Sequence, residues 1–175
     1  GMVGRHAASM ALGLGADVWL LDRSMDVLND LWAQFGHSIK TLYSTRENVE
    51  QQVLAADMVI GSVLLPGAAA PKLVTAEMVR RMQPGSVVVD VAIDQGGCFE
   101  TSRPTTHTEP TYVVDDVVHY CVANMPGAVP RTSTLALNNA TLPYVLLLAD
   151  KGYRQALLED PYFLAGLNVH KGHVT

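Results

Sequence analysis

The chain has 175 residues, of which 49% are hydrophobic and 17% are charged, and its formal net charge is −5. This apolar content excludes a disordered chain, and the acidic balance excludes a strongly basic nucleic-acid-binding protein. The longest apolar run, Leu142 to Ala149, is too short for a transmembrane helix. Two cysteines, Cys98 and Cys121, exclude a disulfide-rich scaffold. We therefore expect a cytoplasmic globular protein with no membrane and no nucleic acid among its partners.

Short apolar runs alternate with segments of helical period, which predicts βαβ units and a parallel sheet. In chain order, strands are expected at 18–22, 39–43, 58–60, 86–91, 112–114 and 117–122, and helices at 5–14, 25–35, 44–56, 75–82, 133–149 and 153–159. Ser24 and Thr75 are predicted N-caps, and Ser44 with Glu47 is a predicted capping box. Pro143 predicts a kink in the long C-terminal helix.

The start of the chain carries glycines at a spacing typical of dinucleotide-binding turns. In such a turn, glycine lets the backbone approach a pyrophosphate at a helix N-terminus, and an acidic residue about 20 positions later binds the ribose. Here Asp22 follows Gly4 by 18 positions. A flexible glycine terminus is the other interpretation, because only the second half of the full glycine pattern is present. A carboxylate at position 22 favours NAD over NADP, although Arg23 is adjacent to it. The candidate phosphate contacts are Gly1, Met2, Val3 and Gly4.

In a Rossmann half, a strand precedes the glycine turn and is central in the usual strand order. No strand precedes Gly1 in this sequence. We therefore expect an α/β fold with a Rossmann-like parallel sheet and flanking helices, its first strand missing and two strand edges unpaired. Residues 1–127 are the expected NAD-binding domain. Residues 128–175 are the expected C-terminal helical segment.

Two loops follow predicted strands at their carboxyl ends, where open α/β sheets bind ligands. The loop after the valine-rich strand carries Asp94, which is the candidate carboxylate for chemistry near a nicotinamide. Asn124 ends another strand and is a candidate donor to a cofactor or substrate oxygen. Arg103, in the long loop between them, is a candidate for binding a phosphate or carboxylate. Ordinary turn and surface roles are the alternative for all three.

No metal site is expected, because the six histidines and two cysteines show no ligand spacing. Cys98 lies in the candidate loop, yet no histidine partner is indicated for a nucleophilic role. The serine-hydrolase, phosphate-loop and zinc-protease motifs are absent from the sequence.

At these loops the sequence resembles the alanine dehydrogenase family. The segments that carry the resemblance are 11–18, 89–100, 102–107 and 120–126. The soluble NAD-binding subunit of proton-translocating transhydrogenase shares the scaffold, and it typically differs at Asp94, Gln95 and the segment 102–107. The resemblance implies conversion of L-alanine, NAD and water to pyruvate, ammonium and NADH.

The resemblance also implies roles for individual residues. Asp22 holds the adenosine ribose, and Asp94 corresponds to the catalytic aspartate of the family. Val27 departs from the pattern, because relatives often carry a basic residue there. The other implied cofactor contacts are Ser44, Val63, Leu64, Val91, Ala92, Ile93, Arg103, Val122, Ala123, Asn124 and Met125.

Family members are about twice as long and carry an N-terminal substrate domain, so the resemblance implies a fragment truncated at both ends. Without that domain we expect little or no turnover, because positioning of the reactants accounts for about 7–11 kcal/mol of such barriers. The low charged fraction predicts a covered apolar surface and a homo-oligomer. A non-catalytic nucleotide-binding or oligomerisation module, and a transhydrogenase-like subunit, remain the alternative functions.

Overall fold

The computed structural model describes residues 1–63 and 69–175 and divides into two compact units, Gly1–Met125 and Pro126–Thr175. The strands are β1 (Val18–Asp22), β2 (Ile39–Tyr43), β3 (Met58–Gly61), β4 (Val87–Asp90), β5 (Thr111–Val114), β6 (Val117–Tyr120), β7 (Val169–His170) and β8 (His173–Val174). The α-helices are α1 (Met2–Gly13), α2 (Met25–Phe35), α3 (Arg46–Ala55), α4 (Ala76–Arg80), α5 (Pro130–Glu159) and α6 (Pro161–Leu164). Short 3₁₀ turns are η1 (Gly36–Ser38), η2 (Ile93–Gln95) and η3 (Met125–Ala128).

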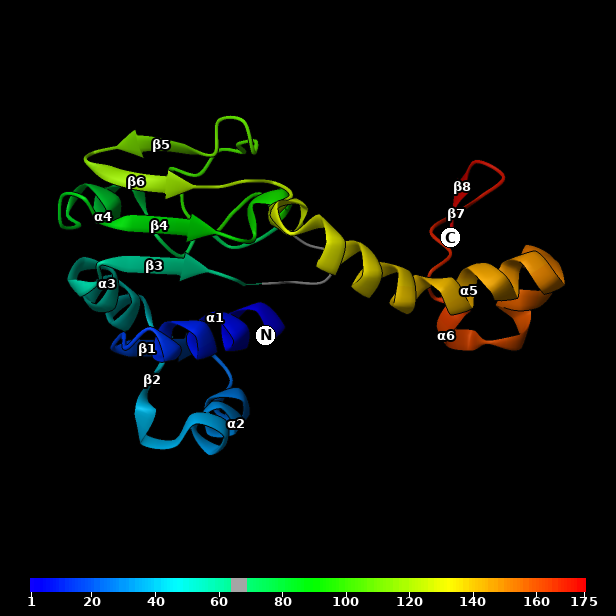
Figure 1. Ribbon diagram of the computed structural model, residues 1–175, viewed down its shortest axis with the longest axis horizontal. Helices are drawn as coiled ribbons and strands as arrows, with labels where there is room; N and C mark the ends of the chain where they lie inside the picture. The colour runs from blue at the N-terminus through cyan, green and yellow to red at the C-terminus, as the bar shows by residue number, and fades with distance from the viewer. Residues whose placement is uncertain (64–68) are drawn as a thin grey trace. The chain divides into compact units, whose positions relative to one another are not determined.

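A four-stranded sheet of order β3–β4–β6–β5 forms the larger part of the first unit. Strands β3, β4 and β6 are parallel and β5 is antiparallel, as the arrows in Figure 1 show. The register pairs Gly61 with Asp90 and Val89 with Tyr120. The carboxyl ends of the three parallel strands therefore lie at one edge of the sheet. The α/β class with a mostly parallel sheet is confirmed.

Strands β1 and β2 form a separate parallel pair, with Val18 opposite Ile39 and Asp22 opposite Tyr43. Among the described residues, β1 pairs only with β2, and β3 pairs only with β4. Each of β1 and β3 thus has one edge without a strand partner.

Two hydrophobic cores hold these sheets. The smaller core joins Ala8 of α1, Val18 of β1, Leu31 of α2 and Ile39 of β2. The larger core packs α3 and α4 against β4 and β6, and Phe99, which is fully buried, fills part of it. In α2, Leu28 and Leu31 are buried, whereas Met25 and Trp32, at the same helical spacing, are exposed.

Side-chain caps fix the starts of several helices. The Ser24 hydroxyl accepts from Val27 N at 3.3 Å, and the Thr75 hydroxyl accepts from Met78 N at 3.2 Å, which confirms both predicted caps. The predicted capping box of Ser44 and Glu47 is wrong. Thr45 is the N-cap of α3 and accepts from Asn48 N at 3.1 Å, so the helix starts one residue later than predicted.

The second unit, residues 126–175, contains α5, α6 and the β7–β8 hairpin. Helix α5 begins at Pro130, three residues before the predicted start. Its backbone stays helical at Pro143 and leaves the helical range only at Gly152, where φ is 72°. The helix thus continues through Pro143, and the predicted stop at Gly152 is confirmed as a break between two helical segments. Helix α6 and the hairpin were not predicted.

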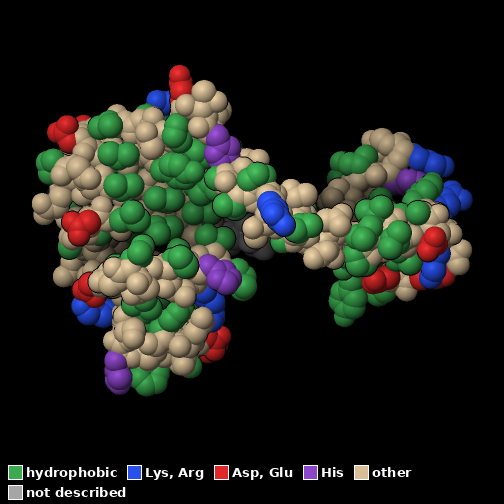
Figure 2. All heavy atoms as spheres, viewed as in Figure 1, with side chains coloured by type: hydrophobic (Ala, Val, Ile, Leu, Met, Phe, Trp, Pro, Cys, Tyr) green, Lys and Arg blue, Asp and Glu red, His purple; other side chains and the backbone are tan. Residues whose placement is uncertain are grey.

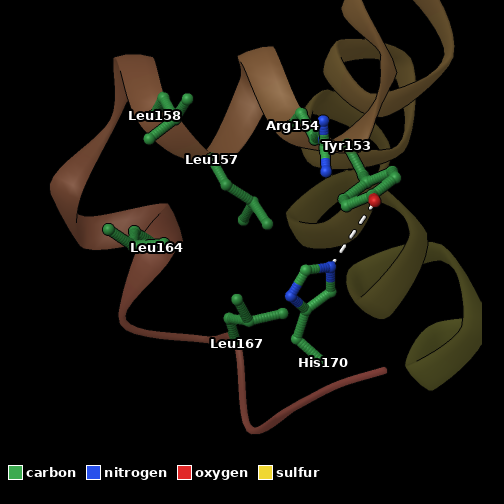
Figure 3. Close-up of a pocket in the computed structure, with 7 residues that line it drawn as sticks. All are labelled: Tyr153, Arg154, Leu157, Leu158, Leu164, Leu167 and His170. Atoms are coloured by element: carbon green, nitrogen blue, oxygen red, sulfur yellow. Dashed lines mark hydrogen bonds between the residues drawn. The ribbon is translucent and has the colours of Figure 1, made fainter. Parts of the chain in front are cut away.

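Apolar side chains are unusually exposed on α5. The stretch 132–149 of this helix contains no charged residue. Figure 2 shows hydrophobic side chains on the visible face of the second unit. The side chains concerned are Leu135, Leu137, Leu142, Tyr144, Val145, Leu146 and Leu148. No helix among the described residues is long and apolar enough to cross a bilayer.

Candidate functional site

Three loops meet at the carboxyl edge of the four-stranded sheet. Val63 follows β3, the segment 91–94 follows β4, and the segment 122–125 follows β6. Val91 N donates to Gly61 O at 2.9 Å, which ties the second loop to the end of β3. The parallel register therefore brings together predicted cofactor contacts that are up to 62 positions apart in sequence (125 − 63). Leu64 lies outside the described residues.

The segment 102–107 is bonded to the loop after β6. Thr105 N donates to Cys121 O at 2.9 Å, and Ala123 N donates to Thr105 O at 3.3 Å. A ring nitrogen of His107 lies 2.6 Å from Asn124 O. These contacts place Arg103 and Asn124 on segments that are joined to each other.

Asp94 is exposed on the short turn η2, directly beyond β4. Its carboxylate makes no hydrogen bond or ion pair within the described part of the chain. Its neighbours Ala92 and Ile93 are buried. Their packing holds the turn in place, while the carboxylate of Asp94 is exposed to solvent. An outward carboxylate on an anchored turn is suited to contact a ligand at this edge.

A buried carboxylate that we did not predict organises this loop. Asp90, at the end of β4, is fully buried and its Oδ2 accepts from Cys98 N at 2.8 Å and from Ser102 Oγ at 2.5 Å. Gly97 has a φ of +78°, and a Cβ there would lie 2.5 Å from Asp90 Oδ2. The sequence did contain a signal for this role of Asp90, because an acidic residue ends the valine-rich strand and two adjacent glycines follow it.

Lys72 stabilises the loop after β4 through hydrogen bonds to two of its backbone carbonyls. Its Nζ donates to Gly96 O at 2.5 Å and to Phe99 O at 3.0 Å. Leu73 N also donates to Cys98 O at 2.9 Å. The loop that carries Asp94 is thus fixed from both the sheet and the segment 69–74.

The start of α1 lies against the end of β3. A Cβ on Gly4 would lie 3.0 Å from Ser62 Oγ, so the two segments are in close contact at this point. Helix α1 has Gly1 as its N-cap and no side-chain cap bond. Backbone N–H groups at the beginning of a helix without a side-chain cap are suitable donors to a phosphate.

Asp22 and Ser44 lie together at the carboxyl ends of β1 and β2. Ser44 N donates to Asp22 O at 2.9 Å, and Asp22 Oδ1 accepts from Ser24 N at 2.9 Å. The Asp22 side chain is therefore oriented by the turn that follows it. The two residues form a group separate from the loops of the larger sheet.

Arg103 is exposed and lies over an aromatic ring. Its guanidinium carbon is 4.0 Å from the centre of the Tyr112 ring, and its backbone N–H donates to the Tyr112 hydroxyl at 2.8 Å. Burial raises the pKa of Tyr112 to about 12, so its hydroxyl keeps a proton to donate to Thr101 O at 2.9 Å.

Cys98 is not suited to a nucleophilic role. Cys98 is buried, and burial raises the pKa of its thiol. A protonated, buried thiol is a poor nucleophile. Within the described residues, no group of three or more His, Cys, Asp or Glu side chains is arranged to hold a metal ion.

The whole chain, residues 1–175, matches the family described as "Alanine dehydrogenase/PNT, C-terminal domain". The chain belongs to this family. Among curated relatives, it is 63% identical over 175 residues to an alanine dehydrogenase of Halomonas elongata, covering 100% of this chain and 47% of the relative. It is 57% identical over 176 aligned positions to alanine dehydrogenase 2 of Staphylococcus aureus, again covering 47% of that protein.

Solved structures agree with this membership. An L-alanine dehydrogenase superposes on the chain with a TM-score of 0.92 and 52% identity, covering 100% of this chain and 48% of that one. A transhydrogenase from Sinorhizobium meliloti superposes with a TM-score of 0.70 and 31% identity, covering 84% of this chain and 42% of that one. The chain thus spans about half the length of the alanine dehydrogenases that it matches.

Proposed function

We propose that this chain binds NAD(H) and supplies the nicotinamide side of an alanine dehydrogenase. The observation that carries the proposal is the meeting of the segments 91–94 and 122–125 at one sheet edge, with Arg103 on a loop bonded to the second of these segments. Residues 1–127 form the cofactor-binding part, in a chain that we expect to be cytoplasmic. Higher identity to alanine dehydrogenases than to a transhydrogenase favours the first activity over the second.

The residues present fit a dinucleotide in three places. The start of α1 offers N–H donors from Gly1, Met2, Val3 and Gly4 to the pyrophosphate, close to the end of β3. Asp22 accepts from the adenosine ribose, with Ser44 beside it. Val63 is a proposed contact of the adenine and ribose, and Leu64, its proposed partner in this contact, lies outside the described residues. The proposed contacts of the nicotinamide end are Val91, Ala92, Ile93, Val122, Ala123, Asn124 and Met125.

The proposed reaction converts L-alanine, NAD and water to pyruvate, ammonium, NADH and a proton. NAD, when bound, supplies the hydride acceptor. The carboxylate of Asp94 is the proposed proton acceptor, and its loop is fixed by bonds from Lys72 and to Asp90. The substrate-binding half of the longer relatives provides the remaining contacts. We therefore expect no measurable alanine-dependent NADH formation from these 175 residues alone.

The strand edges of β1 and β3 support one further part of the proposal. Each has an edge without a partner among the described residues. We infer that the complete sheet of the family places one more strand between them. The pocket must keep its shape without that strand if the chain is to bind the cofactor by itself.

Titration of NADH against the 175-residue chain tests the proposal. Binding should raise the NADH fluorescence and shift it to shorter wavelength, and NADPH should bind more weakly because of the carboxylate of Asp22. Asp22→Ala should weaken NADH binding, whereas Asp26→Ala, a change of the same kind on the exposed surface of α2, should not. An unchanged spectrum at millimolar NADH would contradict cofactor binding by this chain. Equal binding by wild type and Asp22→Ala would remove the ribose contact.

A homo-oligomer is also proposed, because the exposed leucines of α5 lie in a stretch without charge. The wild type should elute with a molar mass that is a multiple of 18.8 kDa in light scattering. Leu137→Glu places a charge on a side chain that is 65% exposed and should reduce that mass, while Asn139→Glu on the same helix is the matched control. A wild type that stays monomeric at every concentration would contradict this part.

A further inference from the structure

Arg103 is held at two points by one neighbouring side chain. The Tyr112 hydroxyl accepts from the backbone N–H of Arg103 at 2.8 Å, while the Tyr112 ring lies 4.0 Å below the guanidinium carbon. The same hydroxyl donates to Thr101 O at 2.9 Å. Tyr112 therefore holds both the backbone of Arg103 and the position of its guanidinium group.

Tyr112 is in turn held by His119. The two residues are directly opposite each other in the antiparallel register of β5 and β6, and their rings are stacked with centres 4.9 Å apart. His119 is fully buried. Its Nδ1 donates to Val117 O at 2.9 Å, and its Nε2 accepts from Thr101 Oγ1 at 2.7 Å. Thr101 thus joins the two rings through its hydroxyl and its carbonyl.

The state of His119 suits this arrangement. Burial and the charge of Arg103 lower the pKa of His119, against the carbonyl of Val117, which raises it. The ring is therefore neutral at neutral pH. A neutral ring adds no second positive charge beside the guanidinium.

The side chain of Arg103 is exposed to solvent. None of the ion pairs among the described residues includes it. Its segment is bonded to the loop after β6 through Thr105, and to Asp90 through Ser102. A cation that is fixed in direction, free of a carboxylate and placed beside the two candidate loops is suited to an oxygen of a bound dinucleotide.

We infer that Tyr112 is a positioning residue for Arg103, which it presents to the bound dinucleotide, and that His119 supports Tyr112 in this task. This inference rests on the proposed function, because the ligand of Arg103 is the cofactor of that proposal. It goes beyond that proposal in assigning a role to two side chains that make no direct contact with the cofactor in it.

A double-mutant cycle on NADH binding tests the inference in the 175-residue chain. Tyr112→Leu removes the ring face and should raise the Kd for NADH about threefold to fivefold, in line with a partly exposed cation–π contact. Tyr112→Phe keeps the ring face and should restore most of the affinity. Arg103→Ala should raise the Kd about tenfold or more, as expected for loss of a charged hydrogen bond. Tyr162→Leu, at a tyrosine that is 92% exposed in the second unit, controls for loss of a ring.

The decisive result is the effect of Tyr112→Leu when Arg103 is already alanine. If Tyr112 acts through Arg103, the Kd should then change by less than about 1.5-fold. An equal effect of Tyr112→Leu in both backgrounds would overturn the inference, because it would show a general loss of structure. Wild-type affinity in Tyr112→Leu would also overturn it while leaving the proposed function intact. Absence of NADH binding by the wild type would instead overturn the proposed function, and with it the cofactor part of the inference.

A second readout needs no cofactor. The ring current of Tyr112 should shift the side-chain proton resonances of Arg103 upfield in the wild type and in Tyr112→Phe. Tyr112→Leu should return them to ordinary values. Unshifted Arg103 resonances in the wild type would show that the two side chains do not stack in solution, and would overturn the positioning role whatever the affinity.

Discussion

Asp90 and Gly97 approach each other so closely that a Cβ on Gly97 would lie 2.5 Å from Asp90 Oδ2. Gly97 also has a φ of +78°, a backbone conformation that L side chains rarely adopt. The position therefore excludes a side chain for two separate reasons. Because the same Asp90 oxygen holds Cys98 N and Ser102 Oγ, the contact couples the glycine turn to the loop that carries Asp94.

Replacing Gly97 with alanine should unfold the chain at lower denaturant concentration. The positive φ alone costs about 1–2 kcal/mol for an L residue, and the contact with Asp90 adds to it. Gly96→Ala is the matched control, because Gly96 has a φ of +95° and open space around its Cβ. Urea unfolding should show a larger loss of free energy for Gly97→Ala than for Gly96→Ala. Equal losses would mean that the close approach has no energetic consequence.

The position of the α3 cap predicts a difference between two adjacent residues. Thr45→Ala removes the side chain that accepts from Asn48 N and should lower the free energy of unfolding by about 1 kcal/mol. Ser44→Ala should have a smaller effect, since Ser44 lies outside the helix. Thermal unfolding of both variants followed by circular dichroism distinguishes them. A larger effect of Ser44→Ala would restore the capping box predicted from the sequence.

The buried His119 predicts a dependence of stability on pH. Because its pKa is below the ordinary value of 6.5, the unfolded chain binds a proton here before the folded chain does. The associated stability is therefore present above pH 6.5 and is lost as pH falls toward the folded-state pKa, by up to about 1.4 kcal/mol per pH unit.

Removing the imidazole should remove this slope. His119→Gln should unfold with a free energy that falls less between pH 6.5 and acid than in the wild type. The exposed His6→Gln change serves as the control for loss of a histidine. Parallel pH profiles of wild type and His119→Gln would show that the buried ring titrates alike in both states.

Asp94 is expected to matter for turnover more than for cofactor binding. In a longer form that carries the substrate-binding half, Asp94→Asn should lower kcat by about 10²- to 10⁴-fold, the range typical of a lost acid–base group. The Kd for NADH should change only a few-fold. Glu109→Gln, at another exposed loop carboxylate, should leave both quantities unchanged. An unaltered kcat in Asp94→Asn would remove this carboxylate from the chemistry.

Local patterns were sufficient for much of the fold. The helix capped by Ser24 and the strands 18–22 and 39–43 follow from periodicity and capping alone, and the structure confirms their bounds. The error at Ser44 is a shift of one residue. Ser44 and Thr45 are adjacent hydroxyl residues that both fit an N-cap by type, and Thr45 is the one whose side chain accepts from Asn48 N. Pro143 stays helical because a long helix accommodates one missing N–H donor without leaving helical dihedrals.

The supporting residues of the site required tertiary information. Asp90 finds its partners at Cys98 and Ser102, in a loop without periodicity. Tyr112 meets His119 only through the register of β5 and β6, and Arg103 meets Tyr112 only through the path of the loop. The loops that carry Asp94 and Asn124, by contrast, were predicted from the order of strands and loops.

The two cores of the first unit suggest two units of cooperative opening. The smaller core belongs to α1, β1, α2 and β2, and no strand pairing among the described residues joins it to the larger sheet. Amide hydrogens of β1 and β2 should therefore exchange with solvent sooner than those of β4 and β6. A dinucleotide that contacts Asp22 at one end and the loop of Asp94 at the other would slow amide exchange in both pairs of strands together. It would thereby couple the opening of the two cores.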